Sequence, residues 1–177
     1  MEAAVAQQPL TDRQVLKALR AFRKGDFSAR LPTGYDGIDG EIAETFNDVV
    51  ELNQRLMKEL SRLSTSVGKE GKTSQRAELT DARGGWQTSI DSVNSLVSDM
   101  AYPTAEVARV IGAVAKGDLS QTVELNIDGR PLRGEFLRIG KIVNTMVGQL
   151  SSFASEVTRV AREVGTEGKL GGQADVK

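Results

Sequence analysis

The 177-residue chain has no histidine and no cysteine, and only 5% of its residues are aromatic. Without histidine, the segment lacks the commonest general base, the commonest zinc ligand and any phosphorylated histidine. Without cysteine, it can form neither a disulfide nor a thiolate metal site. A compact enzyme usually needs several large rings in its core and pocket, so the low aromatic content argues against that class. We therefore expect no catalytic residue, cofactor or metal.

Charge and hydropathy argue against two further kinds of partner. The 23 basic and 24 acidic residues nearly cancel, whereas nucleic-acid binding needs a basic stripe. There is no run of about 18 apolar residues that could span a membrane, and the first ten residues do not resemble a signal peptide. We expect a cytoplasmic segment whose parent protein is either soluble or attached to the inner face of a membrane.

Apolar residues recur at helical spacing along most of the chain. In residues 42–67 and 139–164 the steps alternate between four and three, which is typical of a helix whose stripe faces a partner helix. A weaker pattern runs from residue 86 past Pro103 to residue 114. We expect a long helix over about residues 41–67 and short helices near residues 11–24 and 104–116. One apolar stripe cannot be buried by a single helix, so we predict a helical bundle. The predicted seam comprises Val15, Phe22, Ile42, Phe46, Val49, Asn53, Leu56, Leu60, Leu63, Val67, Val93, Leu96, Met100, Val107, Val110, Val114, Ile139, Val143, Met146, Leu150, Phe153, Val157, Val160 and Val164.

Asparagines occur in and beside this seam. Asn53 is the one polar seam member, and two interpretations remain open: it is tolerated at a partly solvated edge, or it fixes the register of parallel helices at a cost in stability. Asn47, Asn94 and Asn144 lie next to seam positions. We expect these three to cap or bond the connecting segments rather than to bind a ligand.

Glycine-containing breakers separate the helical patterns, and one of them occurs twice. Residues 24–31 read KGDFSARL and residues 116–123 read KGDLSQTV. Glycine readily adopts the left-handed conformation that ends a helix, so each breaker is predicted to stop a short helix. The following 16 to 18 residues are too many for a hairpin turn and are able to run back along that helix. Residues predicted to anchor these connectors are Gly25, Phe27, Leu31, Gly117, Leu119 and Val123.

Three features of the sequence occur together in one known family. A short helical pattern ends in GDFS or GDLS, and a connector with two spaced apolar residues follows. A second helix then begins near a glutamate, which is Glu135 in the segment that contains GDLS. This helix passes through a pair such as Phe46-Asn47 or Val143-Asn144. With these features the chain resembles a tandem array of HAMP domains from hybrid sensor histidine kinases. The resemblance adds Glu135 to the connector anchors.

The resemblance implies an all-α fold of concatenated, parallel, dimeric four-helix bundles that share continuous coiled-coil helices and have extended connectors. Three units would comprise residues 10–60, 56–101 and 102–154. Residues 151–177 would be the first helix and connector of a truncated fourth unit. The sequences VGKEGK and VGTEGK repeat at a spacing of 97 residues, which fits this division.

Three departures from the family pattern are visible. Ile38 occupies the position where the family has an acidic residue, although Glu41 is close by. The second connector, GKTSQRAELTDARGG, lacks the GD-apolar start. The third connector is five residues longer than the first.

The resemblance implies a non-enzymatic signal relay that forms a parallel homodimer and has no nucleic-acid partner. Its output would be a histidine kinase domain of the same chain, beyond residue 177. The valine-rich, aromatic-poor seam suggests two packings of nearly equal energy. One alternative is a passive coiled-coil dimerisation spacer, and another is an enzyme or small-ligand sensor with a connector pocket. The recurrent breakers disfavour the first alternative, and no convergent catalytic set supports an enzyme.

Overall fold

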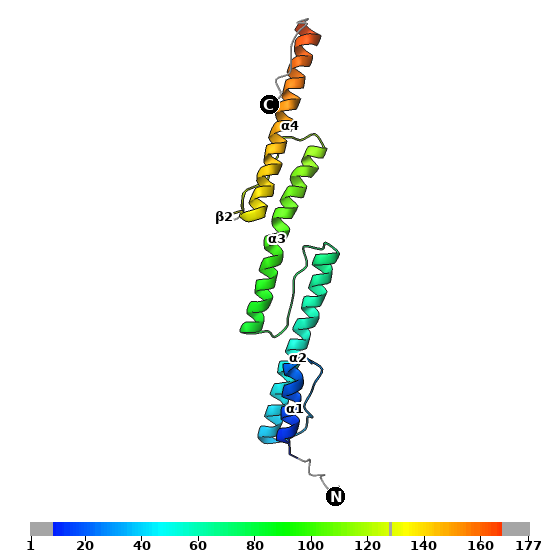
Figure 1. The fold of residues 1–177 in the computed structure, drawn as a ribbon, viewed down its shortest axis with the longest axis vertical. Coiled ribbons are helices and arrows are strands. Elements are labelled where there is room, and N and C mark those ends of the chain that lie inside the picture. The colour runs from blue at the N-terminus through cyan, green and yellow to red at the C-terminus, as the bar shows by residue number, and fades with distance from the viewer. Residues whose placement is uncertain (1–8, 128, 168–177) are drawn as a thin grey trace. The chain divides into compact units, whose positions relative to one another are not determined.

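The computed structural model describes residues 9–127 and 129–167, with the side chains of residues 166 and 167 excepted. This part of the chain is mostly helical, as predicted (Figure 1). The elements in chain order are α1 (Asp12–Arg23), α2 (Gly37–Leu63), the π-helix η1 (Ser64–Lys69), α3 (Gly85–Ala115), β1 (Asn126–Ile127), β2 (Arg130–Pro131) and α4 (Gly134–Glu167). The fold class is therefore all-α, with one small hairpin that the sequence did not predict.

The chain divides into two compact units, Met1–Val97 and Ser98–Lys177. The first unit contains two helix pairs and the second unit contains one. The first pair is α1 with the early part of α2, and the second pair is the later part of α2 and η1 with the early part of α3. The third pair is the part of α3 from residue 98 onward with the early part of α4. One connector joins the two helices of each pair, and we number the connectors accordingly.

Helix α1 begins and ends at residues whose chemistry favours a helix terminus. Thr11 is the N-cap, and its side chain and that of Gln14 accept hydrogen bonds from each other's backbone N–H groups. At the other end Gly25 has a φ of +81°, and the N–H of Asp26 donates to the carbonyl of Ala21. Gly25 thus ends the helix in the left-handed conformation that glycine adopts without strain.

Helices α1 and α2 run side by side in the same direction (Figure 1). Just before α1, the N–H of Leu10 donates to Asp39 near the start of α2, at 3.0 Å. Farther along both helices, the rings of Phe22 and Phe46 lie with centroids 6.2 Å apart. The first connector therefore returns the chain to the start of the pair. The buried core of this pair consists of Ala18, Leu31 and Ala43.

The second pair has its own small core, made of Leu63, Ala77 and Ile90. Ala77 comes from the second connector, and the other two come from the helices. The helix expected over residues 41–67 begins earlier, at Gly37, and its last turn is π-helical instead of α-helical.

In the third pair, Val110 of α3 and two valines of α4 enclose Val123 of the connector. The extra residues of this connector form the hairpin of β1 and β2, in which Asn126 pairs with Pro131 in antiparallel register. After the hairpin, the N–H of Leu132 donates to the carbonyl of Leu125 at 2.9 Å.

Helix α3 continues through Pro103, although the sequence predicted a separate short helix from residue 104. Proline has no N–H and so removes one helical hydrogen bond. The carbonyl that loses its helical donor is that of Asp99, four residues earlier. The hydroxyl of Thr104 donates to the carbonyl of Met100 at 2.8 Å, an additional hydrogen bond in the same turn. One missing bond does not end a helix that is anchored by core contacts on both sides. Across the described residues, none of these helices is long and apolar enough to span a bilayer.

Candidate functional site

An asparagine on the second helix of each pair holds the connector with both atoms of its side-chain amide. In the first pair, Asn47 Oδ1 accepts a hydrogen bond from the N–H of Leu31 at 2.8 Å. Its Nδ2 donates to the carbonyl of the same residue at 2.9 Å. Leu31 is buried, so its backbone N–H and carbonyl need hydrogen-bond partners within the protein. The side chain of Asn47 provides a partner for both. We call this arrangement the asparagine clamp.

The clamp recurs in the other two pairs. Asn94 binds the N–H and carbonyl of Ala77 at 2.8 and 2.9 Å. Asn144 binds those of Val123 at 2.7 and 3.0 Å. The clamped residue is buried each time, because Leu31, Ala77 and Val123 are only 3%, 2% and 2% exposed. The prediction that these asparagines bond the connectors is confirmed.

A glycine lies six residues before every clamped residue. Gly25, Gly71 and Gly117 are spaced 46 residues apart, and their φ angles are +81°, +69° and +83°. The sequence analysis missed Gly71 because the second connector lacks the GD-apolar start. Its position midway between the other two glycines was the signal that could have revealed it. The second connector therefore has the same spacing from glycine to clamped residue as the first and third connectors.

The second pair contains one residue more than the others between its buried first-helix position and its glycine. Ala18 and Val110 precede their connector glycines by seven residues, whereas Leu63 precedes Gly71 by eight. A purely α-helical end would turn the remaining residues out of phase by about 100°. The second pair needs a structural way to accommodate this extra residue.

The π-helix η1 accommodates it. The N–H of Glu70 donates to the carbonyl of Thr65, five residues back, at 3.0 Å. A π-turn encloses one more residue than an α-turn. Gly71 therefore has the same position relative to its helix pair as Gly25 and Gly117 have relative to theirs. The π-turn is therefore the structural consequence of a one-residue insertion.

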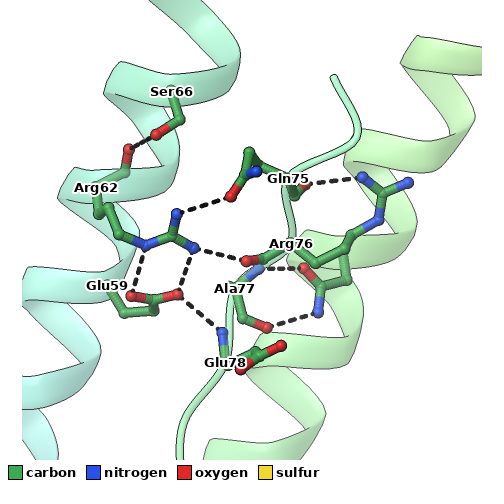
Figure 2. Close-up of polar contacts among 8 residues, drawn as sticks. Glu59, Arg62, Ser66, Gln75, Arg76, Ala77 and Glu78 are labelled. Carbon is green, nitrogen blue, oxygen red and sulfur yellow. Dashed lines mark hydrogen bonds and ion pairs between the residues drawn. The ribbon is translucent and has the colours of Figure 1, made fainter. Parts of the chain in front are cut away.

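In the second pair, a charged group on the first helix also holds the connector (Figure 2). Arg62 on α2 pairs with Glu59 at 2.7 Å. It also donates to the carbonyl of Arg76 at 2.7 Å and to the side chain of Gln75 at 3.2 Å. Glu59 in turn accepts from the N–H of Glu78 at 2.9 Å. We call this arrangement the Glu–Arg clasp, and with the clamp it holds the connector from both helices.

Hydrogen bonding shifts the pKa of both charged members of the clasp. The side-chain hydrogen bond from Arg62 lowers the pKa of Glu59, and the backbone N–H of Glu78 lowers it further, while burial opposes the change. The same pairing raises the pKa of Arg62. Both groups are therefore charged at neutral pH, which strengthens their hydrogen bonds to the connector.

The third pair has the arginine contacts of this clasp. Arg109 on α3 pairs with Glu106 at 2.9 Å and donates to Gln121 at 2.9 Å and to the carbonyl of Thr122 at 3.1 Å. The Glu-x-x-Arg sequence occurs again at 156–159 on α4, where Arg159 pairs with Glu156 at 2.7 Å. The sequence analysis missed the clasp. Because Glu-x-x-Arg also occurs at 135–138, where it has no connector contact, the motif by itself would not have revealed the clasp. A connector after α4 would lie outside the described residues.

The first pair lacks the clasp. At the two corresponding positions of α1, four residues and one residue before Ala18, the chain has Gln14 and Lys17. Gln14 is engaged in the helix cap instead. The first connector has a different contact, from Arg30 to Gln54 on α2, at 3.1 Å.

Most of the predicted seam is not buried within one chain. Only Leu63, Val110 and Val143 are buried, and eleven others are half-buried: Val15, Phe22, Phe46, Val49, Asn53, Leu56, Val67, Val93, Val107, Val114 and Val160. The remaining ten have exposed fractions between 36% and 59%: Ile42, Leu60, Leu96, Met100, Ile139, Met146, Leu150, Phe153, Val157 and Val164. The buried residues Ala43, Val50 and Val147 each lie one position beyond a seam residue. Each helix thus contacts its own chain with one face and leaves a neighbouring apolar face open.

The predicted connector anchors differ in their surroundings. Leu31 and Val123 are buried and clamped, and Phe27 and Leu119 are half-buried. Glu135 is exposed and pairs with Arg138 on its own helix. The structure shows no contact from Glu135 to the preceding described helix, α3.

In the first pair, the residue that ties the start of α2 to the preceding helix is Asp39, through its hydrogen bond from Leu10. The adjacent Ile38, at the position where the family has an acidic residue, is 68% exposed. Asn53 donates to the carbonyl of Val49 on its own helix at 2.8 Å, which leaves both interpretations of this residue open.

The chain was compared with known families and solved structures. The model of the family described as HAMP domain matches residues 81–152. This segment contains α3, the third connector with its clamp and clasp, and the early part of α4. A HAMP domain is therefore present in the chain, and such domains are non-catalytic modules that relay signals in sensor proteins and typically function as dimers. No solved structure matches the chain.

Proposed function

We propose that the chain relays a conformational change through stacked, dimeric HAMP bundles to a histidine kinase domain of the same protein. The observation that carries the proposal is the apolar seam, which stays largely open in a chain whose connectors are held by clamps and clasps. The detected HAMP domain supports the relay class. The proposed relay operates on the cytoplasmic side of a membrane or in the cytoplasm.

The occupant of the open seam is a second copy of the chain, aligned in parallel. The groove between α1 and α2 has a volume of about 470 Å³ and is lined by Leu19, Phe22, Ile38, Glu41, Ile42, Thr45, Phe46 and Val49. A two-fold axis parallel to the helices would bring this groove against its own copy, which completes a four-helix bundle. The same argument applies to the other two pairs.

The area available is sufficient for association. Burying the exposed half of one large apolar side chain contributes about 1 kcal/mol. Ten such seam residues per chain, counted in both copies, exceed the roughly 4–15 kcal/mol that association costs. The dimer is thus favoured without any interchain salt bridge.

The division into units follows the clamps. The proposed units at residues 10–60, 56–101 and 102–154 each contain one connector, one asparagine clamp and one glycine six residues before the clamped residue. The proposed start of a fourth unit, at residues 151–177, is supported by the Glu–Arg pair at 156–159. The repetition of glycine, connector and clamp supports an array of similar modules.

The relay itself uses the contrast between rigid and adaptable contacts. Polar clamps and clasps fix each connector to its own helices, whereas the seam between copies consists of valine, leucine and isoleucine side chains that are able to repack. Two packings separated by a few kcal/mol can be exchanged by a modest input at one end. The alternative is a passive dimerisation spacer, which a strictly regular seam rich in leucine and isoleucine would favour. Four of the eight seam positions in residues 139–164 are valine instead.

Disulfide trapping tests the dimer. Because the chain has no cysteine, Leu60→Cys and Lys58→Cys each introduce a single thiol on the same turn of α2. We expect rapid disulfide dimers from Leu60→Cys, and slow ones from Lys58→Cys, whose side chain points away from the seam. Equal rates would contradict the assigned face.

Spin-label distances distinguish the relay from the spacer. A label at Lys58→Cys reports the separation of the two copies in the second unit, and Met146→Ala changes the seam of the third unit. The relay predicts that the substitution at position 146 alters the distance distribution at position 58. An unchanged, narrow distribution would favour the passive spacer.

A further inference from the structure

The third connector contains residues that its clamp does not require. Between the clamped residue and its asparagine there are 16 residue steps in the first pair and 17 in the second, but 21 from Val123 to Asn144 in the third. The clamp has the same geometry in all three pairs. The extra residues form the hairpin of β1 and β2, which is therefore available for another role.

The hairpin and the start of α4 enclose a cleft against α3. The cleft has a volume of about 510 Å³, within the roughly 300–1,000 Å³ range of small-molecule sites. Its wall on α3 includes Tyr102 and Pro103, and its opposite wall includes Phe136. Pro103 is buried, and Phe136 is half-buried. The cleft lies entirely within the compact unit Ser98–Lys177 and has an apolar, partly aromatic floor.

Two arginines lie at this cleft, Arg130 from the hairpin and Arg133 from the segment before α4. Both are exposed, and neither guanidinium group forms a hydrogen bond or ion pair with any residue that the structure describes. In contrast, Arg62 and Arg109 are fully engaged in clasps. One carboxylate, Asp99, also lines the cleft. Its described cationic groups thus exceed its anionic groups by one.

We propose that this cleft binds a small molecule that combines a flat ring with a single anionic group. The ring packs against Tyr102 and Phe136, because planar groups stack favourably on aromatic side chains. The anionic group is held by Arg130 and Arg133, whose guanidinium groups match the geometry of a carboxylate or phosphate. Asp99 disfavours ligands with several anionic groups. Neither the relay nor the dimer is needed for this proposal.

Aromatic carboxylates and nucleoside monophosphates share this chemistry, and matched probes distinguish them. Isothermal titration of the full 177-residue chain would compare 1-naphthoate with 1-naphthalenemethanol, and AMP with adenosine. We expect at least one anionic probe to bind about tenfold more tightly than its neutral counterpart. Binding of 1-naphthoate would identify the ligand class as aromatic carboxylates. Binding of AMP would identify it as nucleoside monophosphates. The amide signals of Gly129 and Phe136 should shift in the same titration.

Three substitutions then locate the bound anion. Arg130→Gln and Arg133→Gln should each weaken binding about tenfold, while Asp99→Asn should strengthen it. The control is Arg83→Gln, which removes an equal charge from an exposed site in the other compact unit and should leave binding unchanged.

The proposal is wrong if no anionic probe binds at millimolar concentration. It is also wrong if both cleft arginine variants bind as tightly as the unaltered chain. Because the three substituted residues are on the surface, circular dichroism should verify an unchanged helical content in every variant.

Discussion

The first and second connectors reach the same clamped position with different local contacts. In the first connector, Asp26 accepts hydrogen bonds from the N–H and hydroxyl of Ser28, at 3.0 and 2.6 Å, and these bonds lower its pKa. The second connector has no such Asp–Ser turn and relies on the Glu–Arg clasp of Arg62. The GD-apolar motif is therefore one of two arrangements that hold a connector in position.

The third connector uses both devices. Asp118 and Ser120 form the same turn as in the first connector, with the same 3.0 and 2.6 Å bonds, and Arg109 provides the clasp. The third connector should therefore tolerate the loss of either device better than the other two connectors. Four perturbations test this comparison, and they are arranged by the size of the effect.

The largest difference is expected between two single-residue deletions. Deleting Gly68 removes the extra residue of the second pair, so η1 becomes an ordinary helix end and the stability changes by less than about 1 kcal/mol. Deleting Ala115 removes a residue that the third pair needs and displaces Val110 or Gly117 from its position. This should cost more than about 3 kcal/mol, measured by urea unfolding. Equal costs would reject the insertion explanation of the π-turn.

The second largest loss of stability is expected when a clamp is removed. Asn94→Ala leaves the buried N–H and carbonyl of Ala77 without partners, which should cost about 2–4 kcal/mol. Asn47→Ala should cost a similar amount, because the clamp geometry is the same in both pairs. Thermal unfolding measures both variants, and Ser95→Ala on the neighbouring exposed turn is the control. A loss no larger than that of the control would show that the clamp does not stabilise the fold.

A smaller effect is expected from the clasp arginines, and here the two pairs should differ. Arg62→Gln removes the principal device of the second connector and should cost about 1–2 kcal/mol. Arg109→Gln should cost less than about 1 kcal/mol, since the Asp118 turn still holds the third connector. Urea unfolding of both variants tests the order, and a larger loss from Arg109→Gln would contradict the two-device comparison.

The smallest effect concerns pH. Since the folded pKa of Glu59 lies below its usual value of 4.5, its carboxylate contributes stability above pH 4.5, which disappears as the pH falls through the folded pKa. Glu59→Gln should therefore reduce the loss of melting temperature on acidification. Glu135→Gln, in an exposed pair without connector contacts, serves as the matched control. Identical pH profiles for the two variants would argue against a charged clasp.

Much of the fold could be predicted because its signals are local. Hydrophobic periodicity located the long helices, and the two KGD sequences marked the ends of α1 and α3. The asparagines were predictable as connector partners because they recur beside seam positions without entering the stripe. These features depend on backbone preferences and helical spacing, which a single sequence carries.

The remaining features depend on tertiary position. Ala77 is a small residue in a polar segment, so only its burial against Asn94 distinguishes it from a surface alanine. The π-turn becomes visible when residues are counted from the buried Leu63 to Gly71. Arg62 and Glu59 resemble an ordinary solvated i, i+3 pair until the connector is placed beside them.

The asparagine clamps also bear on how such chains avoid unwanted association. An extended segment with free N–H and carbonyl groups is a template on which another molecule can add a β-strand. At Leu31, Ala77 and Val123 the side-chain amide already occupies both groups, so it blocks cross-chain pairing at a buried residue of each connector. A single side chain thereby protects each connector against aggregation while its helices remain free to find their proper partner.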